Sequence, residues 1–196
     1  MLDKEFNKND IGRWWADRGD ATVRVNYDLT EDSVIMDLGG YHGDWTDDMI
    51  KKYNCTSHIF EPVESLVKII ASRFAGDSRV KTYDVAVGDE KKECKIYHGR
   101  DESSLFSVGN DEDFEIIKMM EVSDVLDKIN IEGGEFDLMD AIIDKGLQTK
   151  FGNFQIQFHK VEDDSVERRE RIHEELSKTH VCTWNYPWVW ENWQLK

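Results

Sequence analysis

The amino-acid sequence predicts an α/β fold built around a mostly parallel sheet that helices cover on both faces. Two observations support this prediction. Short apolar runs of strand length alternate with segments whose apolar residues recur at helical spacing. The first run, residues 33–38, is followed at once by glycines, as expected where a buried parallel strand turns into a helix. Parallel sheets of this kind bind ligands at the carboxyl ends of their strands.

The individual elements follow from the spacing of apolar residues. Strands are expected at residues 33–38, 58–62, 80–87 and 154–159, with an extra edge strand at 94–98. Helices are expected at residues 45–53, 66–74, 114–126, 136–143 and 166–178. Two aromatic-rich strands, 181–186 and 189–193, predict a terminal hairpin. Residues 1–30 are expected to form a lead-in, with a short strand at 22–25, that packs on a single domain formed by residues 31–196.

Composition narrows the classes of function. The chain has 196 residues with 25 Lys and Arg against 41 Asp and Glu, a net charge of −16. Nucleic acids and anionic membranes repel such a protein, so neither is the expected partner. No apolar run approaches the ~20 residues that cross a bilayer, and the N-terminus does not resemble a signal peptide. Three cysteines without metal-like spacing are expected to be free thiols in a reducing cytoplasm.

The turn after the first strand reads DLGGYHGD at residues 37–44. The nicotinamide fingerprint G-x-G-x-x-G fails here, because Tyr41 stands where the second glycine belongs. Asp37 comes just before the turn, and a carboxylate there repels a pyrophosphate and favours a ligand with positive charge. S-adenosylmethionine carries an ammonium and a sulfonium group and no phosphate.

Two further acids follow the next two strands. Glu61 stands 22 positions after Gly39, and a carboxylate there can accept both hydroxyls of a ribose. Its alternative role is that of a solvated strand-end acid. Asp84 ends the third strand, where it is placed to contact an adenine amino group or to serve as a surface or capping acid. Together with Asp37 and the glycines, these residues predict a site for S-adenosylmethionine.

An ordered set of motifs resembles a known family. The chain carries DLGGYHGD at 37–44, FEP at 60–62, AVGD at 86–89, SS at 103–104 and KINIEGGE at 128–135. With QIQFH at 155–159 and WENW at 190–193, the set is similar to that of the FkbM family of S-adenosylmethionine-dependent methyltransferases, over residues 12–193.

The resemblance implies a Rossmann-like class I methyltransferase fold, with a seven-stranded sheet that ends in an antiparallel hairpin. It also implies O-methylation of a small-molecule or carbohydrate hydroxyl, with S-adenosylhomocysteine as product. By position, the turn with Gly39, Gly40, Tyr41, Gly43 and Asp44 would hold the methionine part of the cofactor. Glu61 and Pro62 would hold the ribose, Asp84 and Val85 would flank the adenine, and the turn 130–135 would face the methyl group and the acceptor.

The chain departs from this family in one place. The family usually has a loop and a full apolar strand just before the turn at 130–135. Here only residues 127–129 separate the predicted helix from that turn, which is too short for a central strand. Either the protein has lost a piece, or residues are missing from the sequence.

Methylation of a hydroxyl benefits from a base that removes its proton. His159, at the end of the fifth strand, is the first candidate, and its alternative is a histidine bonded to the backbone. Glu132 and Glu135 are further candidates, or caps of the helix that follows. Asn130 could hold a hydroxyl or the cofactor's ammonium. No spacing predicts a dedicated metal site.

Two other functions remain open from the sequence. One is a nicotinamide-dependent oxidoreductase or epimerase that acts on sugars, against which the Gly-Gly turn argues. The other is a degenerate methyltransferase fold that serves as a binding module. The aromatic residues near the C-terminus could stack on a glycan or fill the core of the hairpin. The oligomeric state is open, with a homo-oligomer as one alternative.

Overall fold

The computed structural model describes residues 8–98, 103–104, 114–125, 135–160 and 163–196. The chain divides into two compact units. We call Leu29–Gly134 the central unit, and Met1–Asp28 with Glu135–Lys196 the terminal unit. The expected organisation of residues 31–196 as one domain stays a prediction.

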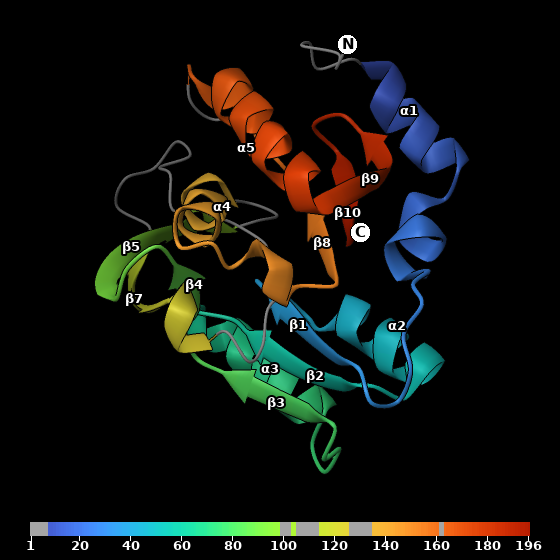
Figure 1. Ribbon diagram of the computed structural model, residues 1–196. Helices are drawn as coiled ribbons and strands as arrows, with labels where there is room; N and C mark the ends of the chain where they lie inside the picture. Colours follow the sequence, from blue (N-terminus) through green and yellow to red (C-terminus); the bar gives the residue numbers. More distant parts are fainter. Residues whose placement is uncertain (1–7, 99–102, 105–113, 126–134, 161–162) are drawn as a thin grey trace. The chain divides into compact units, whose positions relative to one another are not determined.

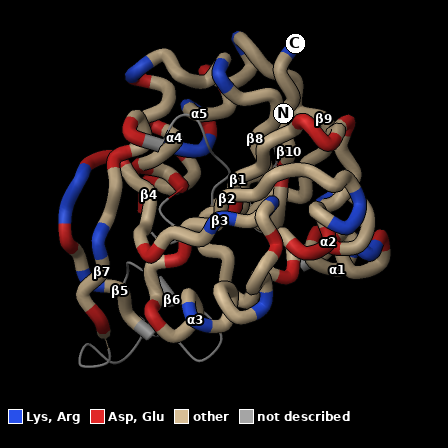
Figure 2. Tube along the Cα trace, turned by 90° about the horizontal axis from the view of Figure 1, so that it is seen from below, with Lys and Arg blue, Asp and Glu red and all other residues tan. Residues whose placement is uncertain are grey.

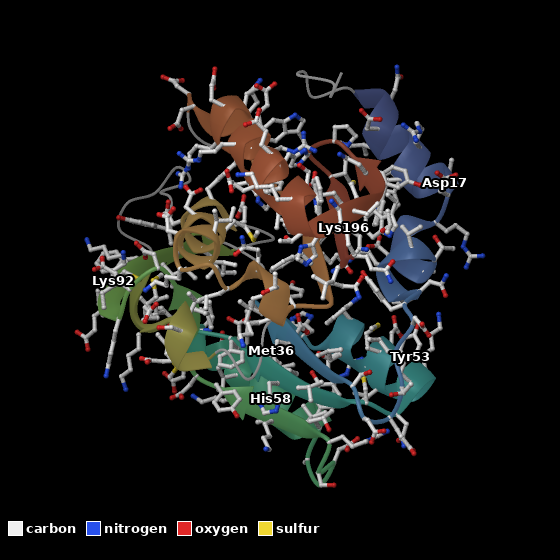
Figure 3. All side chains as sticks on the ribbon, viewed as in Figure 1. Asp17, Met36, Tyr53, His58, Lys92 and Lys196 are labelled. Atoms are coloured by element: carbon white, nitrogen blue, oxygen red, sulfur yellow. The ribbon has the colours of Figure 1, made fainter. Side chains whose placement is uncertain are left out.

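The central unit contains the predicted parallel sheet. Its strand order is β1-β2-β3, with all neighbours parallel, and Met36 on β1 pairs with His58 on β2 (Figure 3). The strands and connecting helices are β1 (Val34–Leu38), α2 (Asp44–Tyr53), β2 (Thr56–Phe60), α3 (Glu64–Arg73) and β3 (Val80–Tyr83) (Figure 1). Four of the five residues of β1 are buried, as are four of five in β2. The predicted alternation of strand and helix is confirmed here.

A second sheet of the central unit was only partly predicted. Its order is β4-β7-β5-β6, in which β7 pairs parallel with β4 and antiparallel with β5. The elements are β4 (Ala86–Gly88), β5 (Lys92–His98), β6 (Ser103–Ser104), β7 (Phe114–Glu121) and the 3-10 turn η3 (Val122–Val125). Since β5 has a partner on both sides, it is not the edge strand that the sequence predicted. The single strand expected at 80–87 is divided between β3 and β4, which belong to different sheets.

The helix predicted at residues 114–126 is wrong, because Phe114–Glu121 is the strand β7. Ile117 and Met119 are buried on one side of β7, and Phe114 and Ile116 are exposed on the other. This is the period of two that a half-buried strand requires. The same apolar residues also fit helical spacing, and pairing with β5 decides between the two.

The terminal unit contains an antiparallel sheet of order β8-β10-β9. Its elements are α1 (Lys8–Ala16), η1 (Gly19–Ala21), η2 (Val23–Val25), α4 (Glu135–Asp144), η4 (Gln148–Lys150), β8 (Asn153–Ile156), α5 (Ser165–Thr179), β9 (His180–Tyr186) and β10 (Trp190–Leu195). The hairpin of β9 and β10 confirms the predicted terminal hairpin. The strand expected at 22–25 is wrong, because Val23–Val25 forms a 3-10 turn. The strand expected at 154–159 ends at Ile156.

The N-terminal residues of the terminal unit pack on this hairpin. The Trp14 ring lies edge-on to the Tyr186 ring, with 5.2 Å between centroids, in a buried cluster that includes Trp190. The Tyr186 hydroxyl donates to Asp17 Oδ2 at 2.7 Å, and the Arg24 guanidinium lies 4.0 Å from the centre of the Trp190 ring. The aromatic residues of the hairpin therefore fill a core, which was one of the two predicted roles.

The described residues do not form the seven-stranded sheet that the resemblance implies. The described residues form sheets of three, three and four strands, and the all-parallel sheet has three. The central strand was expected just before the turn at 130–135, and residues 126–134 lie outside the described residues. In the described ranges, no helix is both long and apolar enough to cross a membrane.

Candidate functional site

The three segments predicted to bind a cofactor leave the parallel sheet at one edge. Leu38, Phe60 and Tyr83 end β1, β2 and β3, and the register places them side by side. The ladder extends one residue further, because the N–H of Gly39 donates to the Phe60 carbonyl at 2.8 Å. The N–H of Glu61 donates to the Tyr83 carbonyl at 3.0 Å. The glycine turn, Glu61 and Asp84 therefore share the carboxyl edge of the sheet, as predicted.

The glycine turn requires glycine for two reasons. Gly39 and Gly43 adopt φ of 76° and 77°, a region that side chains disfavour. A Cβ on Gly40 would lie 2.2 Å from Ile59 Cγ2, and a Cβ on Gly43 would lie 2.6 Å from the Phe74 ring. The turn is therefore packed closely against β2 and the end of α3.

Glu61 is a buried carboxylate that holds the turn. Its side chain is 3% exposed, so it is not the solvated acid that was one alternative. Oε2 accepts the N–H of Tyr41 at 3.0 Å, and Oε1 accepts the N–H of Val63 at 2.9 Å. The pKa of Glu61 is raised to about 7, first by burial and then by the negative charges of Asp37 and Glu115, which together outweigh the two amide hydrogen bonds.

Asp37 is also buried, at 5% exposure, and it contacts the following helix. Its Oδ2 accepts the hydroxyl of Thr46 on α2 at 2.7 Å, and that hydroxyl lies 3.2 Å from Ser57 Oγ. Asp37 thus joins β1 to α2. Its charge acts on Glu61 through space and helps to raise the pKa of that carboxyl group.

Arg73, which the sequence analysis did not single out, fastens the far side of the turn. Its guanidinium donates to the carbonyl of His42 at 2.8 Å and to the carboxylates of Asp44 and Asp47. A basic residue at the end of α3 was visible in the sequence, but its partners are 26 to 31 positions away.

The remaining predicted cofactor residues differ in exposure. Val85 is buried and Pro62 is half-buried, whereas Asp44 and Asp84 are exposed. Acidic residues of α2, near the turn, are drawn red in Figure 2.

In the terminal unit, His159 is paired with Glu135. Glu135 begins α4 and is buried, and its Oε1 accepts the backbone N–H of His159 at 2.8 Å. The same oxygen lies 3.0 Å from His159 Nδ1, and the imidazole side chain is 41% exposed. A carboxylate at Nδ1 favours the tautomer with the proton there, which makes Nε2 the basic nitrogen. The structure therefore pairs His159 with a buried carboxylate at Nδ1, while Asn130 and Glu132 lie outside the described residues.

The described residues contain no group of three or more His, Cys, Asp or Glu side chains arranged to hold a metal ion. Glu135 contacts His159, and Glu61 contacts backbone amides.

Comparisons with known proteins add little to this geometry. No protein-family model matches the sequence, and no curated protein matches it. A provisionally assigned rRNA methylase from Clostridium thermocellum is 10% identical with a TM-score of 0.48, over 98% of this chain and 100% of that chain. The MccD protein is 10% identical with a TM-score of 0.28, over 96% and 97%. At these scores neither similarity supports an argument about this chain, and membership of the FkbM family stays a prediction.

Proposed function

We propose that the chain is an S-adenosylmethionine-dependent methyltransferase. The observation that carries the proposal is the buried Glu61 at the carboxyl end of β2, bonded to the glycine turn through the N–H of Tyr41. A carboxylate at this position of a parallel sheet is suited to the two hydroxyls of a ribose.

The donor and acceptor set at this edge fits the cofactor. An ionised carboxylate has about four lone-pair sites, and the amides of Tyr41 and Val63 use two of those on Glu61. Capacity remains for two hydroxyl donors. The two buried acids, Asp37 and Glu61, favour a cation and disfavour a pyrophosphate. This preference distinguishes S-adenosylmethionine from a nicotinamide dinucleotide.

The cofactor would supply an electrophilic methyl group, and the chain's own residues would position the acceptor and take its proton. We assign the proton to His159 Nε2, with Glu135 holding the imidazole by Nδ1. A base of this kind contributes about 100- to 10,000-fold to rate. The acceptor class that suits such a base is a hydroxyl, on a small molecule or a carbohydrate.

A binding experiment tests the proposal without knowledge of the acceptor. Thermal shift and calorimetry are measured with S-adenosylhomocysteine and, separately, with NAD. A ligand that binds only the folded state raises the melting temperature, so S-adenosylhomocysteine should raise it and NAD should not. Glu61→Ala should abolish the shift, and Glu64→Ala, an exposed acid on α3, should retain it. Stabilisation by NAD alone, or by neither ligand, would reject the proposal.

The binding-module alternative is favoured by the parallel sheet of the described residues, whose three strands are fewer than the seven that the family resemblance implies. A panel of hydroxyl acceptors with labelled cofactor separates the two functions. For an enzyme, His159→Ala should lower turnover far more than it lowers affinity for S-adenosylhomocysteine. Retained cofactor binding with no transfer to any acceptor would favour the module.

A further inference from the structure

Tyr41 has a backbone conformation that its side chain disfavours. Its φ is 49°, in the left-handed region, between two glycines that also have positive φ. Glycine and asparagine adopt this region far more readily than an aromatic residue does. A residue kept in an unfavourable conformation at a ligand-binding turn indicates that its side chain has a function.

Contacts on both sides of Tyr41 fix this conformation without help from the ring. The Tyr41 N–H donates to Glu61 Oε2 at 3.0 Å, and the carbonyl of His42 accepts from Arg73 at 2.8 Å. Both bonds involve the backbone of the turn, so a different side chain at position 41 could form them equally well. The aromatic ring is therefore not needed to shape the turn.

The ring itself is presented to solvent. Tyr41 is 48% exposed, and its ring stacks on that of His42 with 3.8 Å between centroids and 25° between planes. His42 thus covers one face of the Tyr41 ring and holds it in place. About half of the Tyr41 surface therefore remains accessible for contact with a ligand.

We propose that the exposed aromatic ring of Tyr41 contacts the sulfonium group of S-adenosylmethionine and so distinguishes the charged cofactor from its neutral product. The inference rests on the proposed function. One carbon atom separates the sulfonium from the ribose ring. The backbone N–H of Tyr41 donates a hydrogen bond to Glu61, the carboxylate assigned to that ribose. A cation within about 6 Å of an aromatic centroid is attracted by the electrons of the ring face.

This contact has a consequence for turnover. Transfer of the methyl group converts the sulfonium into an uncharged thioether, and the cation–π attraction is lost at that moment. The ring therefore holds substrate more firmly than product, which favours exchange of S-adenosylhomocysteine for a new cofactor.

Two variants separate the ring from the backbone. Tyr41→Phe keeps the aromatic face, whereas Tyr41→Asn removes it and keeps a residue that tolerates the left-handed region. Dissociation constants for S-adenosylmethionine and S-adenosylhomocysteine are measured by calorimetry for each variant. The ratio of the two affinities should be unchanged in Tyr41→Phe. In Tyr41→Asn it should shift about three- to tenfold against the charged cofactor.

Each result has a distinct meaning. An equal loss of both affinities in Tyr41→Asn, or a Phe variant that behaves like Asn, would overturn the inference and leave the proposed function in place. If the unmodified chain binds neither ligand, both this inference and the proposed function are overturned. If Tyr41→Asn does not fold, Tyr41→Gly gives the same comparison, since glycine suits the observed φ best.

Discussion

Glu61 should make the folded protein less stable as pH rises through neutrality. Its pKa is raised from 4.5 to about 7 in the folded chain. Between these values the folded state keeps a proton that the unfolded state has released, so stability falls as pH increases. With about 1.4 kcal/mol for each pKa unit, the loss between pH 5.5 and pH 8.5 is about 2 kcal/mol.

Glu61→Gln removes this titration and keeps the shape of the side chain. The amide can replace only one of the two acceptors that serve Tyr41 and Val63, but that cost does not depend on pH. Urea denaturation at several pH values gives the unfolding free energy of both proteins. The other titrating groups contribute equally to both values, so their contributions cancel in the difference. The difference should change by about 2 kcal/mol over this range, in favour of Gln at high pH.

The matched control is Glu64→Gln on the exposed surface of α3. It changes the composition in the same way and should leave the pH dependence of stability unchanged in this range. If the unfolding free energies of Glu61→Gln and the unmodified chain run parallel across pH, Glu61 does not titrate near neutrality. The argument from its burial would then be refuted.

Two further substitutions test the packing of the turn and of the terminal unit. Gly43→Ala should destabilise by about 2 kcal/mol more than Gly76→Ala, because both have positive φ but only the first places a Cβ against the Phe74 ring; equal losses in urea would contradict the clash. Glu191→Gln should cost about 3–5 kcal/mol, since the buried carboxylate accepts bonds from a buried guanidinium, an imidazole and an indole. The exposed Glu174→Gln on α5 should cost little, and a similar small loss for both would show that the buried network contributes no net stability.

The parallel sheet could be predicted because its first two strands have clear ends in the sequence. Residues 34–38 and 56–60 are short and closed by a glycine turn or a proline. Residues 114–121 were predicted wrongly because their apolar positions satisfy both periods. Only pairing with Lys92–His98, some 20 positions earlier along the chain, selects the strand. The spacing of apolar residues within 114–121 does not indicate this pairing partner.

The candidate site shows the same division. Its place at the carboxyl edge followed from topology, because Glu61 and Gly39 come directly after neighbouring parallel strands. The hydrogen bonds of the site could not be predicted from the sequence. The contact of Glu135 with His159 spans 24 positions, and that of Arg73 with His42 spans 31. These pairs depend on how helices pack, which no motif spacing specifies.

Asp37 makes a contact that the sequence prediction did not include. The sequence suggested a carboxylate that meets the ligand, whereas the structure directs Asp37 Oδ2 to the hydroxyl of Thr46. A buried carboxylate retains its field even when a hydrogen bond satisfies it, and that field reaches Glu61. Under the proposed function, the preference for a cation would belong to the pair of acids together. Glu61 would contact the ribose, and Asp37 would contribute through its field and through its hydrogen bond to Thr46 on α2.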